Sequence, residues 1–149
     1  MKKVINSVTL RFPSRSSNEA FARSAAAAFV AQLDPTLDEL GDVKTAVSEA
    51  VTNCIVHGYR DSVGTVSMTL KLLEPAAVEI VVKDKGCGIE DVRAARTPLF
   101  TTGGSERSGM GFTIMESFMD SLSVRSAPGK GTTVRMRKTL SQRVCGGAK

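Results

Sequence analysis

One stretch of the chain, from Thr36 to Gly58, has the periodicity of a long amphipathic helix. Its apolar residues recur every three or four positions, as one face of an α-helix requires. These apolar positions are Leu40, Val43, Val47, Ala50, Val51, Cys54 and Ile55. Thr36 with Glu39 three residues later is a capping-box signal, and Gly58 is a stop signal. A helix with one apolar face must pack on another layer, so the fold class depends on the other segments.

Those segments carry both strand and helix signals. Ser16 and Glu19 have capping-box spacing and predict an alanine-rich helix to about Leu33, where Asp34-Pro35 ends it. Shorter helices are expected near residues 89–95 and 111–119, and strands at residues 4–12, 65–73, 77–83, 121–126 and 132–138. This order predicts an α+β two-layer sandwich, with a mixed, mostly antiparallel sheet and helices on one face. Residues 1–140 are expected to form one domain and residues 141–149 a frayed tail.

Composition narrows the class of protein. No run approaches the roughly 18 apolar residues that span a bilayer, and polar residues interrupt the N-terminal stretch that a signal peptide needs, so we expect a cytoplasmic protein without membrane contact. The net charge is +5, but aromatic residues are only 5% and the basic residues are dispersed. This pattern favours phosphates or an acidic partner over direct nucleic-acid binding. Three separated cysteines and a single histidine argue against a zinc site.

The first candidate site cluster lies on the long predicted helix. Glu49, Asn53 and His57 follow one another at steps of four residues, which places them on one slowly drifting stripe. Such a triplet alone is most often a solvated helix face, but the apolar residues beside Asn53 place it at the border of the buried face. There an amide oxygen can ligate a hard cation, and a carboxylate one turn away can accept a proton.

The second cluster, Asp84-Lys85-Gly86-Cys87-Gly88, directly follows a predicted strand. A carboxylate at a strand end can accept a hydrogen bond from the exocyclic amine of adenine, whereas the carbonyl of guanine at that position would be repelled. Gly86 and Gly88 would let the backbone approach a flat ring closely. Taken alone, this spacing is more often an ordinary turn.

The third cluster is Arg107-Ser108-Gly109-Met110-Gly111-Phe112. Residues 97–111 are rich in Gly, Ser and Thr and are expected to form a mobile loop that becomes a helix at Gly111. Backbone N–H groups at a helix start favour anions, and Arg107 could pair with a terminal phosphate; a glycine-rich hinge is the alternative. The glycines do not have the spacing of a P-loop or a dinucleotide-binding fingerprint.

Together the clusters resemble, in the right order, the N, G1 and G2 boxes of the GHKL (Bergerat-fold) ATPase and kinase superfamily, and residues 129–134 resemble its last box. Within it, the chain resembles the anti-sigma F factor family of spore-forming bacteria over nearly its whole length. Five strings carry this closer resemblance: Asn18–Arg23, Ala31–Thr36, Val47–Asn53, Pro98–Thr102 and Arg107–Glu116. The resemblance implies Mg-ATP binding, homodimerisation and serine kinase activity. It also implies two protein partners: a sporulation sigma factor, held inactive by the ATP form, and an anti-anti-sigma protein that is phosphorylated on serine.

The resemblance also implies residue roles. Glu49 would be the general base and Asn53 the magnesium ligand, while Asp84 would bind adenine with Thr132 supporting it. Arg107 would reach the terminal phosphate. The remaining nucleotide contacts would be Gly86, Gly88, Ser108, Gly109, Met110 and Gly111. Arg23, on the alanine-rich helix, is a candidate partner contact or an ordinary solvated arginine.

The sequence departs from the family at residues 103–106, where the ATP lid is glycine-rich and shorter. Three alternatives stay open. The chain could belong to the general stress-response branch of anti-sigma kinases, or be a binding module in which ATP only supports a sigma-binding surface. It could also be a catalytic fragment of a sensor histidine kinase, but that class carries its phosphoacceptor histidine on a separate helical domain. His57 lies inside the N box and has no assigned catalytic task; an interaction with the helix dipole accounts for it.

Overall fold

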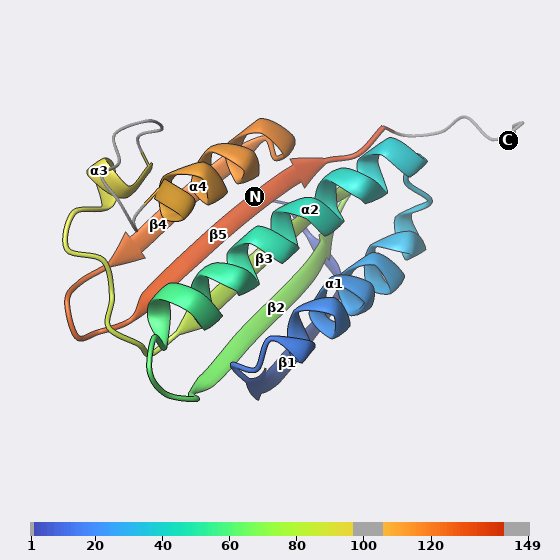
Figure 1. Ribbon diagram of the computed structural model, residues 1–149. Helices are drawn as coiled ribbons and strands as arrows, with labels where there is room; N and C mark the ends of the chain where they lie inside the picture. The colour runs from blue at the N-terminus through green and yellow to red at the C-terminus, as the bar shows by residue number, and fades with distance from the viewer. Residues whose placement is uncertain (1, 97–105, 142–149) are drawn as a thin grey trace, which may run out of the picture.

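The computed structural model describes residues 2–96 and 106–141, and the side chains of all of these except 106–110. Five strands form one sheet in the order β1-β2-β3-β5-β4, and helices α1, α2 and α4 lie side by side on one of its faces (Figure 1). Every strand pair in the described ranges is antiparallel. The predicted α+β class with helices on one face is confirmed.

The strands are β1 (Val4–Pro13), β2 (Thr65–Leu73), β3 (Ala77–Asp84), β4 (Ser121–Ser126) and β5 (Thr132–Thr139). The helices are α1 (Ser17–Val30), α2 (Leu37–Asn53), α3 (Val92–Arg96) and α4 (Glu106–Phe118). A 3₁₀ turn, η1 (Ala31–Leu33), follows α1, and a π-helical turn, η2 (Cys54–Gly58), follows α2. The predicted strand positions agree with the observed ones within about a residue.

The core lies between the sheet and the helices. Strand side chains alternate between the two faces, so every second residue of β2 points toward the helices and is buried. The helix α2 buries Val43, Ala46, Val47, Ala50 and Val51 against this layer. Because α2 lies between α1 and α4, its flanks are also in contact with both neighbours. One side of α2 is thereby held rigidly on the sheet.

The face of the sheet that α1, α2 and α4 leave uncovered contains a buried carboxylate. Glu79 of β3 accepts hydrogen bonds from Arg135 at 2.9 Å and from Arg137 at 2.5 Å, both on the neighbouring strand β5. Burial alone would raise the pKa of Glu79, but the hydrogen bond from Arg137 and the positive charges of Arg135, Arg137 and Lys71 lower it. Glu79 therefore stays ionised and joins β3 to β5.

The predicted capping box at the start of α2 is confirmed. The Thr36 hydroxyl accepts the Glu39 N–H at 3.0 Å, and Glu39 Oε1 accepts the Thr36 N–H at 2.8 Å. The second Glu39 oxygen accepts the N–H of Ser141 at 2.6 Å, which ties the end of the described chain to α2. Partial burial alone would raise the pKa of Glu39, but the hydrogen bonds from Thr36 and Ser141 lower it to about 2.

The predicted capping box at the start of α1 is wrong. Ser16 has helical backbone angles, φ −58° and ψ −31°, and its side chain makes no capping hydrogen bond. A capping side chain reaches the next turn from an extended backbone, which Ser16 lacks. Glu19 instead lies 3.1 Å from Arg23 on the following turn. The α-helix also ends at Val30, and only a 3₁₀ turn continues to Leu33.

Two further boundaries differ from the prediction. The helix α4 begins at Glu106 rather than at Gly111, so the expected loop does not extend over residues 106–111. Contact with α2 and burial of Phe112 and Met115 favour helix despite the glycines, because tertiary packing outweighs local propensity. The short helix α3 covers Val92–Arg96 rather than 89–95. The rest of the predicted loop, residues 97–105, and the tail after Ser141 lie outside the described residues.

Across the described ranges, no helix has both the length and the apolar character needed to cross a membrane.

The Glu39 contacts predict how stability depends on pH. Replacing Glu39 with alanine removes the capping box and the contact to Ser141, and we expect it to cost about 1 kcal/mol of unfolding free energy at pH 7. Because the folded-state pKa is lowered from 4.5 to about 2, this contribution is complete above pH 4.5 and disappears as the pH falls toward 2. Urea denaturation of both proteins over this pH range measures the difference.

The matched control is Glu74→Ala, which removes an exposed carboxylate from the turn between β2 and β3. It should leave both the stability and its pH dependence nearly unchanged. A stability difference between the parent and Glu39→Ala that stays constant down to pH 2 would contradict the assignment.

Candidate functional site

The end of β3 meets the end of α2 at a buried carboxylate. Asp84 is the last residue of β3 and is only 7% exposed. Its carboxylate lies directly against Gly58 of η2, because a Cβ on Gly58 would come within 2.9 Å of the Asp84 Oδ2 atom. The corner formed by Gly58 and Asp84 is where the first two predicted clusters approach each other.

The surroundings of Asp84 set its ionisation. Burial raises the pKa of this carboxyl, and hydrogen bonds from the Gly86 N–H, the Cys54 thiol and the Thr132 backbone offset part of the increase. The Gly86 N–H donates to Asp84 Oδ1 at 2.8 Å. Burial, and next the charge of Asp84, raise the pKa of Cys54, so this thiol stays protonated. A desolvated carboxylate of this kind is a strong acceptor for a donor on a ligand.

The glycines after Asp84 are required by close backbone approaches. A Cβ on Gly86 would lie 2.0 Å from the carbonyl oxygen of Gly58. Gly88 has a φ of +77°, and a Cβ there would lie 2.0 Å from the carbonyl oxygen of Ala127. No other residue fits either position without moving the backbone. These close approaches join segments of the protein itself, and the predicted approach of this backbone to a flat ring stays a prediction.

Glu49 and Asn53 lie together on the side of α2 that faces α4. A Cβ on Gly111 of α4 would lie 3.2 Å from Glu49 Oε1 and 3.3 Å from each of the two polar side-chain atoms of Asn53. The structure thus brings residues of the first and third clusters close together. Asp84 lies farther along the chain direction of this helix, against Gly58, the last residue of the π-helical turn η2.

Asn53 carries a buried polar atom without a partner. Its Nδ2 atom is inaccessible to solvent and makes no hydrogen bond within the described residues. Leaving a buried donor unsatisfied costs about 1–3 kcal/mol, so such an atom marks a place where a ligand group is expected. The oxygen and nitrogen of an amide can exchange places by rotation, so the same group can offer an oxygen to a cation. The arrangement fits a magnesium ligand.

The rest of the third cluster is described only as backbone. Arg107, Ser108, Gly109 and Met110 lie in the first turns of α4, and their side chains fall outside the described residues. The prediction that Arg107 reaches a terminal phosphate stays a prediction.

Thr132 of β5 lies next to Asp84 on the sheet, and Ser126 of β4 lies next to Thr132. Thr132 pairs with Asp84 across β3 and β5, but its hydroxyl bonds to the Ser126 hydroxyl at 2.8 Å and not to Asp84. Ser126 also accepts the Ile89 N–H at 2.7 Å and donates to the Gly131 carbonyl at 2.8 Å. The sequence analysis missed Ser126. The strand Ser121–Ser126 contains several serines, and no local pattern shows which of them binds the loop at Ile89.

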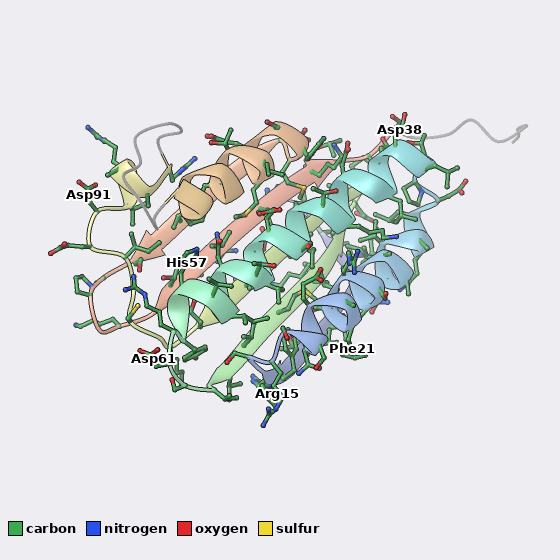
Figure 2. All side chains as sticks on the ribbon, viewed as in Figure 1. Arg15, Phe21, Asp38, His57, Asp61 and Asp91 are labelled. Atoms are coloured by element: carbon green, nitrogen blue, oxygen red, sulfur yellow. The ribbon has the colours of Figure 1, made fainter. Side chains whose placement is uncertain are left out.

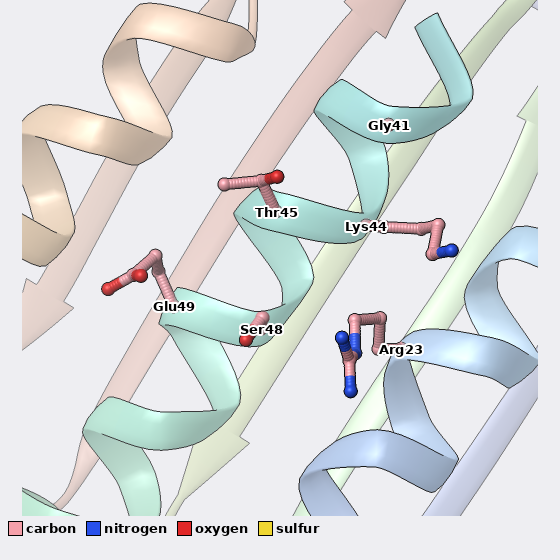
Figure 3. Close-up of a pocket in the computed structure, with 6 residues that line it drawn as sticks. All are labelled: Arg23, Gly41, Lys44, Thr45, Ser48 and Glu49. Carbon is pink, nitrogen blue, oxygen red and sulfur yellow. The ribbon is translucent and has the colours of Figure 1, made fainter. Parts of the chain in front are cut away.

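Arg23 lies outside this corner. Together with residues of α2 it lines a groove of about 320 Å³ on the outer surface between α1 and α2 (Figure 3). The lining residues are Arg23, Gly41, Lys44, Thr45, Ser48 and Glu49. Arg23 Nε is 3.1 Å from Glu19 Oε2, an ion-pair distance without hydrogen-bond geometry, and its side chain is 40% exposed. Glu49 contributes to the lining, but its carboxylate points away from Arg23, toward α4 (Figure 3).

His57 belongs to the last turn of η2. Figure 2 shows it near the C-terminal end of the α2 helix, with Asp38 at the opposite end. This position fits the predicted interaction with the helix dipole.

Comparison with known proteins places these residues in a family context. The model of the family described as histidine kinase-like ATPase domain matches residues 12–138. A protein of Caldanaerobacter subterraneus named anti-sigma F factor is 54% identical over 138 residues, covering 92% of this chain and 96% of the relative. A Geobacillus kaustophilus protein of the same name is 55% identical over 139 residues, covering 92% and 94%.

Solved structures agree on the fold. The crystal structure of the RsbU and RsbW domains of a Mycobacterium tuberculosis protein matches with a TM-score of 0.68 at 18% identity, over 93% of this chain and 33% of that one. The histidine kinase domain of a blue-light activated kinase from Erythrobacter litoralis matches with a TM-score of 0.55 at 21% identity, over 83% and 65%.

Because Gly86 packs against the backbone of Gly58, we expect that adding one methyl group at Gly86 lowers the stability of the fold. Gly86→Ala would place its Cβ against a backbone carbonyl that cannot rotate away, and we expect a loss of about 1–3 kcal/mol of unfolding free energy. The matched control is Gly41→Ala on the exposed face of α2, where nothing lies within 4 Å. This control should gain about 0.5–1 kcal/mol through helix propensity. Denaturant midpoints of the two variants measure the effects, and equal midpoints would contradict the described corner.

Proposed function

The chain belongs to the histidine kinase-like ATPase domain family, within it to the anti-sigma F factors, and we propose that it binds Mg-ATP beside α2 and acts as a serine kinase and anti-sigma factor. Two observations support the proposal: Glu49 and Asn53 lie beside Gly111 on the side of α2 that faces α4, and Asp84 lies against Gly58 at the π-helical end of the same helix. A nucleotide lying along this side would have its base at one end and its phosphates at the other.

The base end is the corner at Asp84. We assign the desolvated carboxylate to the exocyclic amine of adenine, with Gly86 and Gly88 bringing backbone close to the ring and Thr132 holding Asp84 from β5. A base with a carbonyl at that position would place two acceptors against each other. The proposed site is therefore specific for adenine over guanine.

The phosphate end is the contact between α2 and α4. The unsatisfied buried amide of Asn53 fits a magnesium ligand, and Gly111 leaves room beside it because it has no side chain. Magnesium, when bound, would supply charge neutralisation to the phosphates. The sequence motif assigns Ser108, Gly109 and Met110 to phosphate contacts and Arg107 to the terminal phosphate.

Glu49 is the proposed base. Its carboxylate lies beside Asn53, so it would stand next to the phosphate that is transferred. Glu49 would accept the proton of an incoming serine hydroxyl, or orient that hydroxyl, while the phosphoryl group passes through a loose transition state. A rate contribution of 10²–10⁴-fold is typical for such a base.

The groove between α1 and α2 supports the assignment of Arg23 as a partner contact. A protein segment lying along Arg23 and Lys44 would contact the same stretch of α2 that carries Glu49 on its other side. We propose an anti-anti-sigma protein as this partner. We further propose that the ATP form holds a sporulation sigma factor and that the protein is a cytoplasmic homodimer, both inferred from the family.

Replacing Glu49 with glutamine separates catalysis from binding. The amide keeps the size of the side chain but accepts no proton, so we expect serine phosphorylation to fall by at least about 100-fold while ATP affinity changes less than about twofold. Phosphate transfer from labelled ATP to a purified anti-anti-sigma partner and calorimetric ATP binding measure the two quantities.

The control variant is Asp38→Asn, which neutralises an exposed carboxylate at the other end of α2. It should phosphorylate at the parent rate. A parent rate for Glu49→Gln would remove the base assignment. Sigma-factor binding by a parent chain that labels no serine would instead favour the non-catalytic binding module.

A further inference from the structure

A single side chain connects the end of α2 to the loop that follows Asp84. Tyr59 directly follows the π-helical turn, and its hydroxyl accepts the Lys85 N–H at 2.6 Å. The same hydroxyl donates to the Thr65 carbonyl at the start of β2, at 2.8 Å. One phenolic oxygen therefore joins β2 to the residue next to the proposed adenine-binding carboxylate.

The position of the Tyr59 ring is fixed from two sides. Its backbone N–H donates to the Cys54 carbonyl at 3.0 Å, which closes the π-helical turn. On the other side the ring lies against Gly64, where a Cβ would come within 2.2 Å of the ring atom Cε1. The hydroxyl therefore reaches Lys85 from a ring that has little freedom to move.

The three N–H groups after Asp84 are all bound. Lys85 donates to the Tyr59 hydroxyl, Gly86 donates to Asp84, and Cys87 donates to the Gly58 carbonyl at 2.9 Å. Two of these three bonds go to adjacent residues, Gly58 and Tyr59, at the end of α2. The backbone that follows Asp84 is thus held by the end of η2, the turn that continues α2, the helix that also carries Glu49 and Asn53.

We propose that Tyr59 is a positioning residue for base recognition: its hydroxyl holds the backbone at Lys85 so that the Asp84 carboxylate faces the purine. The inference rests on the proposed nucleotide site and assigns Tyr59 no contact with the nucleotide. Both hydrogen bonds of the hydroxyl are exposed. In a variant without the hydroxyl, water can bind the two freed backbone groups, so we expect the fold to be retained. The substitution should then change the binding of the base and not the stability of the protein.

The test compares a ligand with a base and a ligand without one. Tyr59→Phe keeps the ring and removes the hydroxyl. We expect the affinity for Mg-ATP to fall about 3–10-fold, the equivalent of one hydrogen bond, and the affinity for magnesium tripolyphosphate to stay unchanged. The control Thr9→Val removes a hydroxyl from the exposed Thr9–Thr69 pair on β1 and β2 and should leave both affinities unchanged.

A second readout uses the composition of the chain. Tyr59 is the only tyrosine, so a sample labelled with ¹³C-tyrosine gives one set of ring resonances. These resonances should shift when Mg-ATP is added and stay in place with tripolyphosphate.

Each outcome decides the inference. A Tyr59→Phe variant that binds Mg-ATP as tightly as the parent, or that loses both ligands equally, would overturn the positioning role. A parent chain that binds no Mg-ATP would overturn the proposed function itself, and the inference with it.

Discussion

The buried carboxylate of Asp84 is the constraint on which the rest of the site depends. A charge removed from water is tolerated only when hydrogen bonds replace its solvation, and Asp84 receives them from Gly86, Cys54 and Thr132. These donors come from the loop after β3, from the π-helical turn and from β5. Satisfying one side chain therefore holds together three segments that are remote in the sequence.

The helix α2 links this corner to the proposed chemistry. Its buried face fixes it on the sheet, while the side toward α4 carries Glu49 and Asn53. The π-helical turn then brings Gly58 against Asp84, and π turns inside helices are frequent at functional sites. In the proposed nucleotide site, the helix would set the distance between the base end and the phosphate end, which is what recognition of a whole nucleotide requires.

Much of this arrangement could be predicted from the sequence, because the signals were local. Each of these signals depends on the geometry of a single helix or strand. They are the Thr36–Glu39 capping box, the alternation along the strands and the four-residue spacing of Glu49 and Asn53. Predictions were wrong at Ser16 and at the start of α4, where packing between elements decides the backbone. Tyr59 and Ser126 were missed for the same reason: each hydrogen-bonds across the fold to partners that no spacing rule relates.

The central claim is that Asp84 accepts the exocyclic amine of adenine at a site shared with Asn53 and Glu49. Calorimetric titration of the purified chain with Mg-ATP and with Mg-ITP tests it most directly, because ITP carries a carbonyl in place of that amine, together with a hydrogen on the neighbouring ring nitrogen N1. The account predicts that ATP binds at least about 10-fold more tightly, since the exchange replaces a donor to a buried carboxylate with a second acceptor. Equal affinities for the two nucleotides would contradict it.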